Sequence, residues 1–263
     1  LPVDPEGAYL ITGGLGGLGL AVARRLVERG ARHVTLLGRR PPSEAAAVVL
    51  HELSGAGARV EAVQADVSRR PELGRVLDRI RATGLPLRGI VHSAVVLDDA
   101  TVANLDRSRF ESVFAPKVDG AWNLHELSLG DPLDWFVLFA SVSSLLGSPG
   151  QANYAAANSY LDALACERAS RGLPALSIDW GPWAEIGQAA AAANRGERLA
   201  ARGLPGLSPA EGLAAFEALA LRAPSPQVAV LPFDLRKWRQ FHGRTAAWPV
   251  FAELAAAAPT ASR

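Results

Sequence analysis

The chain has 263 residues, of which 49% are hydrophobic and 20% charged, and its formal net charge at pH 7 is +1. This composition is ordinary for a soluble globular protein and excludes disorder over most of the chain. The near-neutral charge argues against nucleic acid or an anionic membrane as a partner, and no apolar run reaches the roughly 18–20 residues that span a bilayer.

Short apolar runs alternate along the chain with longer helical patterns. Most of these runs are continuously apolar, as expected of strands buried on both faces of a parallel sheet. The predicted strands are Ala8–Thr12, His33–Gly38, Arg59–Gln64, Leu87–His92, Trp135–Ala140, Ala175–Asp179 and Gln227–Leu231. The predicted helices are Leu18–Arg29, Ser43–Gly55, Pro71–Thr83, Arg107–Ser128, Ala152–Arg171 and Pro209–Leu221. This order predicts an α/β fold with a doubly wound parallel sheet of Rossmann type.

Two segments depart from this alternation. The alanine-rich stretch at about 184–207 is predicted to be a mobile helical lid over a pocket, with a plain surface helix as the alternative. The Ala/Pro-rich end, residues 246–263, is predicted to be a short helix that runs into an interdomain linker. The catalytic domain is therefore predicted to occupy residues 1–245.

A glycine-rich loop follows the first predicted strand and opens the first predicted helix. Glycines allow positive φ and let the backbone approach a pyrophosphate, and the helix N-terminus offers N–H groups and the positive end of its dipole. This position favours a dinucleotide site over a plain glycine-rich turn. The residues of the loop are Thr12, Gly13, Gly14, Leu15, Gly16, Gly17, Leu18 and Gly19.

The second predicted strand is followed by an arginine that indicates which dinucleotide binds. Arg39 lies 20 residues after Gly19, where an acidic residue would bind the ribose 2′-hydroxyl of NAD. Arginine instead accommodates a 2′-phosphate, so NADPH is the predicted cofactor. Asp66, which follows the third predicted strand, is placed to accept a hydrogen bond from the adenine amino group, and a helix cap or turn aspartate is an equal alternative.

Four polar residues farther along form a set that fits carbonyl reduction. Ser141 follows the fifth predicted strand, and Tyr154 and Asn158 lie one helical turn apart on the same face. A tyrosine can donate the proton when a nearby cation lowers its pKa from about 10, and Lys117 could supply that cation. Serine can hold and polarise the carbonyl oxygen. Taken singly, each residue is better explained by an ordinary structural role, as a turn residue, a half-buried aromatic, a surface amide or a solvated charge. The four residues together favour catalysis.

These motifs together resemble the short-chain dehydrogenase/reductase superfamily, and within it the catalytic half of a ketoreductase domain from a modular type I polyketide synthase. Most short-chain reductases have lysine four residues after the tyrosine and an asparagine upstream. Here Asn158 and Lys117 have exchanged places, as in synthase ketoreductases. The resemblance covers about residues 7–240 and rests on Tyr9–Gly19, Lys117–Ala121, Ser141, Asn153–Asn158 and Trp180–Trp183.

The resemblance implies a substrate and partners. The substrate would be a β-ketoacyl thioester on the phosphopantetheine arm of an acyl carrier protein, and an upstream structural half and other synthase domains would be partners. Further cofactor contacts would come from Val67, His92, Ser93, Ala94, Pro182 and Trp183. As a general base His92 is a poor candidate, because a packed histidine at a strand end is the simpler interpretation. No cluster has the spacing of metal ligands.

Two further segments predict the stereochemistry. Leu97-Asp98-Asp99 resembles the fingerprint of B-type ketoreductases, and Leu146 stands where A-type domains carry a tryptophan. The loop Leu97–Asp99 is predicted to border one entrance for the pantetheine arm. The segment Leu145–Gln151, with Leu146, Pro149 and Gln151, is predicted to line the other. The resemblance thus implies a 3-hydroxyacyl product of D, or (3R), configuration. The alternative is that the two aspartates only keep a surface loop solvated or cap the helix that follows.

Two other functions remain open at this point. An inactive relative would bind NADPH or shape the multienzyme without reduction, but such relatives are expected to lose the tyrosine, the serine or the glycines. A free-standing alcohol dehydrogenase is disfavoured by the Lys/Asn exchange and by the absence of any methionine, which suggests a piece of a longer protein.

Without a secretion signal the expected compartment is the cytoplasm. The single cysteine, Cys166, is predicted to be a small buried residue.

Overall fold

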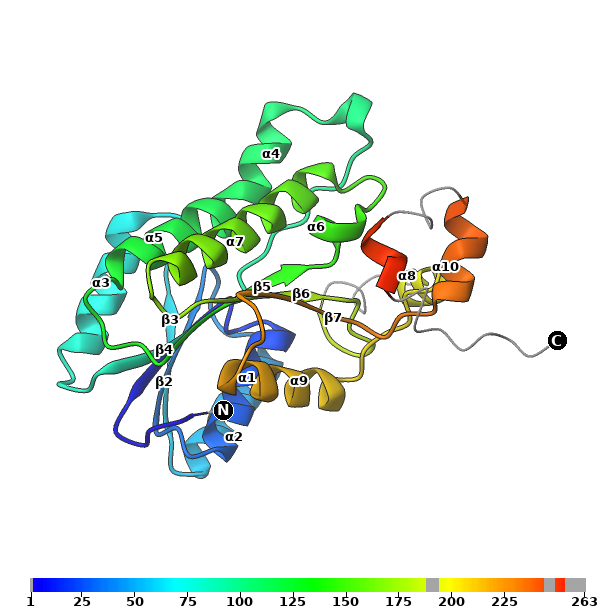
Figure 1. The fold of residues 1–263 in the computed structure, drawn as a ribbon. Coiled ribbons are helices and arrows are strands. Elements are labelled where there is room, and N and C mark those ends of the chain that lie inside the picture. The colour runs from blue at the N-terminus through cyan, green and yellow to red at the C-terminus, as the bar shows by residue number, and fades with distance from the viewer. Residues whose placement is uncertain (1, 188–193, 244–248, 254–263) are drawn as a thin grey trace. The chain divides into compact units, whose positions relative to one another are not determined.

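A computed structural model describes residues 2–187, 194–243 and 249–253 (Figure 1). Within these residues the core is a seven-stranded sheet of order β3-β2-β1-β4-β5-β6-β7. Every neighbouring pair of strands in it is parallel. The order reverses between β1 and β4, so the predicted doubly wound sheet is confirmed.

The seven strands lie close to where the apolar runs predict them. β1, β5 and β6 are buried almost throughout, as expected when helices cover both faces of a parallel sheet. Compared with the prediction, β5 is one residue longer, β6 is shifted by one residue and β7 is one residue shorter. The strands are β1 Ala8–Thr12, β2 His33–Gly38, β3 Arg59–Gln64, β4 Leu87–His92, β5 Trp135–Ser141, β6 Leu176–Trp180 and β7 Gln227–Val230.

Helices cover the two faces of this sheet. In Figure 1, α3, α5 and α7 lie over one face, and α1, α2 and α9 lie over the other. The first face buries a continuous apolar cluster that includes Leu10, Leu77, Phe136 and Leu161. The helices on the sheet are α1 Gly17–Glu28, α2 Glu44–Gly55, α3 Arg70–Arg81, α4 Arg107–Phe114, α5 Gly120–Leu127, α6 Ser143–Leu146, α7 Ala152–Ser170 and α9 Pro209–Leu221.

Two sequence predictions about this part are wrong, and one short helix was missed. The single helix expected over 107–128 is α4 and α5 separated by a π-helical turn, Ala115–Asp119. This turn contains Pro116, which lacks an N–H and therefore cannot make the usual bond to the carbonyl four residues earlier. The four-residue helix α6 was not predicted, because it is too short to show a helical period. Cys166 is exposed on α7 instead of buried.

The chain divides into two compact units. The sheet unit holds residues 1–180 and 212–230, and the second unit holds residues 181–211 and 231–263. The predicted catalytic domain, 1–245, therefore spans parts of both units. Its boundary stays a prediction. No helix in the described parts of the chain is long and apolar enough to cross a membrane.

The second unit contains α8 Arg195–Ala201 and α10 Leu235–His242. Asp234 caps α10 by accepting from the Lys237 amide at 3.0 Å, and the Trp238 ring lies 5.5 Å from Phe233 and 5.8 Å from Phe251. The helix α10 was not predicted. Within the predicted lid, α8 is the helical part that the structure describes, and residues 188–193 lie outside the described residues. Of the predicted linker, the described part is residues 249–253, which hold a 3₁₀ turn, Pro249–Phe251.

Candidate active site

The glycine-rich loop joins the carboxyl end of β1 to the start of α1, and it leaves no room for side chains on its inner side. Gly13 has φ +67°, and a Cβ there would lie 2.7 Å from the Ser93 carbonyl oxygen and the Ala94 amide nitrogen. A Cβ on Gly19 would lie 2.5 Å from the Gly14 Cα, whereas one on Gly16 would meet only the Gly13 oxygen, at 3.4 Å. The loop is therefore packed tightly against β4 and open on its outer side, which fits a bound pyrophosphate.

The end of β4 is bonded to this loop. Ser93 donates from its amide and its hydroxyl to the Thr12 carbonyl, at 3.0 and 2.8 Å. His92 is fully buried, and its Nδ1 lies 2.7 Å from the Thr12 Oγ1. Burial, followed by the charge of Lys117, lowers the pKa of His92 to about 3. His92 is therefore a packed histidine at a strand end whose ring stays neutral near pH 7.

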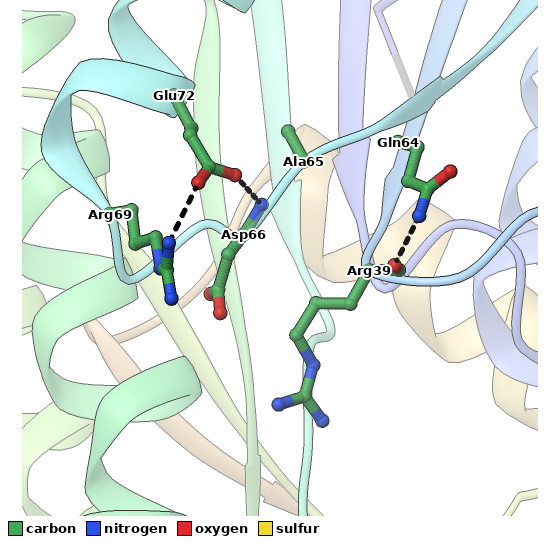
Figure 2. A pocket seen from close by; sticks show the side chains of 6 residues that line it. All are labelled: Arg39, Gln64, Ala65, Asp66, Arg69 and Glu72. Atoms are coloured by element: carbon green, nitrogen blue, oxygen red, sulfur yellow. Dashed lines mark hydrogen bonds and ion pairs between the residues drawn. The ribbon is translucent and has the colours of Figure 1, made fainter.

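A polar pocket of about 380 Å³ lies where β2 and β3 end (Figure 2). The carbonyl of Arg39 accepts from the Gln64 Nε2 at 3.1 Å, and its side chain extends into the same space as that of Asp66. Among the described residues, the Arg39 guanidinium has no hydrogen bond or ion pair. A guanidinium left without a protein partner in a polar pocket suits a phosphate. The pocket is lined by Arg39, Gln64, Ala65, Asp66, Arg69 and Glu72.

Asp66 borders this pocket and also forms a turn. Its carboxylate accepts from the Ser68 amide at 3.0 Å and from the Ser68 hydroxyl at 2.7 Å. The turn interpretation is thus confirmed, and Asp66 also lines the pocket. Val67 is buried, and its carbonyl accepts from the Asn123 Nδ2 at 3.2 Å. Its side chain would be 2.8 Å from a Cβ on Gly120, so Val67 packs against the start of α5.

Lys117 and Tyr154 are 37 positions apart in the sequence and adjacent in the structure. The Lys117 Nζ lies 5.4 Å from the centroid of the Tyr154 ring and donates to the Phe139 carbonyl at 2.9 Å. Lys117 is only 2% exposed, and it projects from the π-helical turn. Burial lowers the pKa of Lys117 to about 7, against the opposing charges of Asp162 and Asp179. A cation beside the phenol is the arrangement that the sequence predicts.

Ser141 and Asn158 are each fixed by hydrogen bonds to neighbouring backbone groups. Ser141 ends β5, and its Oγ accepts from the Ser143 amide at 3.2 Å, which fixes it at the start of α6. Asn158 is fully buried and donates from Nδ2 to the Tyr154 carbonyl at 2.7 Å. Its Oδ1 has no hydrogen-bond partner among the described residues. That oxygen is the polar group that Asn158 can offer to the site.

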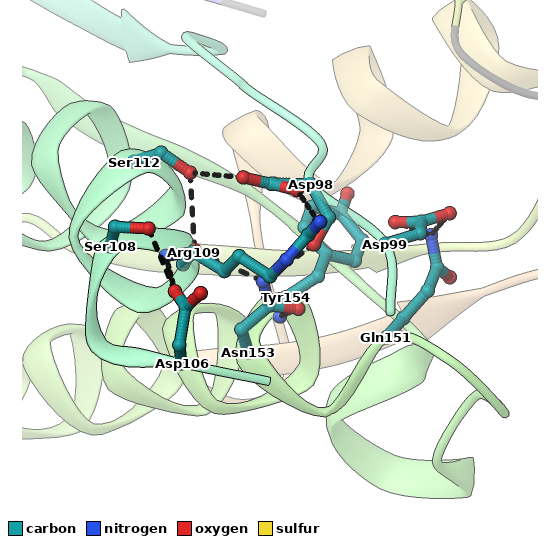
Figure 3. Close-up of polar contacts among 9 residues, drawn as sticks. All are labelled: Asp98, Asp99, Asp106, Ser108, Arg109, Ser112, Gln151, Asn153 and Tyr154. Carbon is teal, nitrogen blue, oxygen red and sulfur yellow. Dashed lines mark hydrogen bonds and ion pairs between the residues drawn. The ribbon is translucent and has the colours of Figure 1, made fainter. Parts of the chain in front are cut away.

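The loop Leu97–Asp99 is tied to both helices beside it (Figure 3). Asp98 forms an ion pair with Arg109 on α4 and accepts from the Ser112 hydroxyl at 3.2 Å. Asp99 accepts from the Gln151 Nε2, at 3.0 and 3.1 Å to its two oxygens. Neither aspartate caps a helix, since the cap of α4 is Asp106. Each carboxylate therefore has a specific partner in the fold, while its part in guiding the pantetheine arm stays a prediction.

Asn153 connects this loop to the tyrosine. Its Nδ2 donates to the Asp98 carbonyl at 2.9 Å and to the Arg109 carbonyl at 3.1 Å, and its Oδ1 accepts from the Tyr154 amide at 2.9 Å (Figure 3). Neither this role of Asn153 nor the contact of Arg109 was predicted from the sequence. An arginine 11 positions from its partner carries no local signal.

The two segments predicted to border different entrances are bonded to each other. Besides the Gln151–Asp99 contact, the Ala100 amide donates to the Gly150 carbonyl at 2.9 Å. Leu146 ends α6, and Pro149 lies in the turn that follows, where the Ser148 hydroxyl donates to the Gln151 Oε1 at 2.8 Å. The two segments are thus joined to each other at this end, and their places beside the two entrances stay predictions.

The last two predicted cofactor residues belong to the second unit. The Pro182 carbonyl accepts from the Leu207 amide at 2.7 Å, and Trp183 forms a parallel bridge with Leu207. Trp183 is 5% exposed. Their part in cofactor binding stays a prediction. Among the described residues, no group of three or more His, Cys, Asp or Glu side chains could hold a metal ion.

Known proteins share these features. A model of the KR domain family matches residues 7–185. The chain therefore belongs to the KR domain family, the ketoreductase domains of polyketide synthases, which are dinucleotide-dependent reductases. It is 43% identical over 218 residues to the phthioceranic/hydroxyphthioceranic acid synthase of Mycobacterium tuberculosis, covering 82% of this chain and 10% of that protein. It is 47% identical over 220 residues to the spectinabilin polyketide synthase system protein NorB of Streptomyces orinoci, covering 82% of this chain and 10% of that protein.

Solved ketoreductases have the same fold. An A-type ketoreductase from a modular polyketide synthase superposes with a TM-score of 0.86 and 38% identity, covering 91% of this chain and 50% of that one. The ketoreductase from the first module of phoslactomycin biosynthesis in Streptomyces sp. HK803 superposes with a TM-score of 0.87 and 37% identity, covering 93% of this chain and 56% of that one. A C2-type ketoreductase also matches, with a TM-score of 0.79 and 30% sequence identity. Because both of these types match, overall similarity does not determine the stereochemical type. The chain spans about half the length of the solved relatives and about a tenth of the curated ones.

Proposed function

We propose that this chain uses NADPH to reduce a β-ketoacyl thioester, carried on the phosphopantetheine arm of an acyl carrier protein, to a D-(3R)-3-hydroxyacyl thioester. The observation that carries the proposal is the buried Lys117 ammonium, 5.4 Å from the centre of the Tyr154 ring. Other domains of a polyketide synthase are the proposed partners, since the curated relatives are large synthase proteins.

Each polar residue of the site has a distinct part in this reaction. The bound nicotinamide supplies the hydride. Tyr154 gives its phenolic proton to the substrate oxygen as negative charge develops there, and the Ser141 hydroxyl donates a hydrogen bond to the same oxygen. Lys117 stabilises the phenolate that remains on Tyr154, because an opposite charge at short range favours the ionised form. Asn158 is fixed through its own helix, and its Oδ1, which has no partner among the described residues, is left to accept a further hydrogen bond.

The proposal is tested with a model substrate. The protein is incubated with NADPH and an N-acetylcysteamine β-ketothioester, and loss of NADPH absorbance and formation of the hydroxythioester are followed together. Stoichiometric conversion is expected. Binding of NADPH without turnover would instead identify a non-reducing relative, and equal turnover of small diffusible ketones would indicate a free-standing alcohol dehydrogenase.

Arg39 is proposed to select NADPH over NADH. Contacts between a guanidinium and a phosphate are worth about 1.5–3 kcal/mol, so Arg39→Ala should reduce the preference for NADPH by roughly 10- to 150-fold in kcat/KM. Efficiency with NADH should hardly change. Arg40→Ala is the matched control, because Arg40 is the exposed neighbour and does not line the pocket. Unchanged discrimination in Arg39→Ala would remove this residue from cofactor selection.

The product is expected to have the D configuration. The face of the nicotinamide is set by the fold, so the configuration depends on the side from which the pantetheine arm enters. In this proposal the loop with Asp99 borders one entrance and the segment with Leu146 lines the other, and the Asp99–Gln151 contact supports the proposal by joining the two segments. Chiral chromatography of the reduced thioester against both synthetic enantiomers measures the outcome. A predominantly L product would contradict the assignment.

A further inference from the structure

Two buried carboxyl groups lie within electrostatic reach of Lys117, and the proposed reaction uses neither. Asp162 is 7% exposed on α7, and Asp179 is fully buried on β6. Asp162 follows Tyr154 by eight positions and Asn158 by four, so all three share one face of α7. Ser177 and Asp179 lie two positions apart on the same face of β6, and the Ser177 hydroxyl bonds Asp162, which places the two carboxyl groups side by side between α7 and β6. They therefore form a pair inside the core next to the site.

This pair is held by donors from three directions. The Ser177 hydroxyl donates to Asp162 at 2.6 Å, and the Gln227 Nε2 donates to Asp179 at 2.9 Å. The Ser144 hydroxyl is 3.0 Å from Asp179 and 3.0 Å from the carbonyl of Ser141, the serine of the site. Burial, followed by the negative charge of Asp162, raises the pKa of Asp179 to about 7.

The buried Lys117 ammonium needs a nearby negative charge to keep its proton, and none of the described carboxylates contacts it directly. Among the described residues no carboxylate lies within the 4.0 Å of an ion pair with its Nζ, and its hydrogen bond goes to the neutral Phe139 carbonyl. A buried ammonium in this position tends to lose its proton. The titratable groups that interact with it are His92 from β4, Tyr154 and Asp162 from α7, and Asp179 from β6. His92 is neutral, so Asp162 and Asp179 supply the stabilising charge.

We propose that the Asp162–Asp179 pair is the counter-charge that favours the protonated form of Lys117, and that both aspartates are positioning residues acting on Tyr154 through Lys117. The catalytic consequence rests on the proposed function. The charge link between the pair and the lysine does not, and it can be measured without cofactor or substrate.

The chain offers a direct measurement because it has only two lysines, Lys117 and Lys237. Protein labelled with ¹³C at the lysine side chain gives two signals, and Lys237, with 47% of its side chain exposed, serves as the internal reference. In Asp162→Asn/Asp179→Asn the titration midpoint of Lys117 should fall by at least one pH unit, while that of Lys237 should not move. Each single variant leaves one carboxylate and should give a smaller shift. An unchanged Lys117 midpoint in the double variant overturns the proposal.

The reverse effect gives an independent test if the double variant does not fold. Coupling between two sites is reciprocal, so removing the lysine must change the pair. In Lys117→Met, the carboxyl ¹³C signals of the two aspartates should titrate at a higher pH than in the unaltered chain. Identical carboxyl titrations in both proteins would equally overturn the proposal.

The pH dependence of turnover separates this role from a structural one. In Asp162→Asn/Asp179→Asn, kcat should fall near pH 7.5 by about tenfold for each unit by which the Lys117 midpoint has moved, and it should recover at lower pH. An equal loss at every pH would show a structural effect and contradict the proposal. Asp78→Asn, an exposed carboxylate on α3, is the control and should leave the profile unchanged. If the unaltered chain does not reduce the thioester at all, the proposed function fails, while the lysine titration still decides the charge link.

Discussion

Replacing Tyr154 by phenylalanine should lower turnover of a β-ketothioester by about 10²–10⁴-fold, the usual loss when a general acid is removed. The aromatic ring remains, so the contact with the Lys117 ammonium, 5.4 Å from the ring centroid, is preserved. The glycine-rich loop and Arg39 are untouched, and NADPH affinity should therefore change by less than twofold. Steady-state kinetics and a fluorescence titration with NADPH measure the two effects separately.

Tyr160→Phe is the matched control for this variant. Tyr160 lies on the same helix, is partly buried against the apolar cluster and has a pKa raised by burial, which makes its phenol a poorer source of protons. Its variant should retain turnover within about twofold, because the hydroxyl is not part of the polar set around Lys117. Near-normal turnover in Tyr154→Phe would exclude the phenol as the proton donor.

The central strands were predictable because continuous apolar runs leave few alternatives. The bounds of β1 to β4 match the prediction, and each run is short and ends in turn residues or polar residues. The π-helical turn was not predictable from periodicity, since one extra residue in a helix of 20 shifts the pattern only slightly. Cys166 was misplaced because a residue type that is usually buried can sit on the exposed face of a helix.

The site was predictable where a short motif fixes the spacing and not where a distant contact does. The Tyr154–Asn158 relation follows from one helical turn, and the position of Lys117 followed from the resemblance. The ion pair between Asp98 and Arg109 and the Asp162–Asp179 pair join separate elements and have no local pattern. Both depend on how α4, α7 and β6 pack, which only the folded chain shows.

Gly13→Ala should be among the most damaging single changes in the sheet unit. Gly13 has φ +67°, a left-handed conformation that costs a residue with a side chain roughly 1–2 kcal/mol. Its Cβ would also lie 2.7 Å from the backbone of Ser93 and Ala94, which cannot rotate away, and such overpacking adds about 1–3 kcal/mol. We expect a total loss of about 2–5 kcal/mol in the free energy of unfolding, measured by urea denaturation.

Gly57→Ala separates the two causes. Gly57 has φ +83°, but no atom lies within 4 Å of the position of its Cβ, so this variant reports backbone strain alone, roughly 1–2 kcal/mol. Gly13→Ala should also weaken NADPH binding, because the clash pushes the loop away from the end of β4, whereas Gly57→Ala should not affect binding. Equal losses of stability in the two variants would mean that packing does not constrain the close approach of the loop to β4. Undiminished NADPH affinity in Gly13→Ala would mean that the pyrophosphate binds elsewhere.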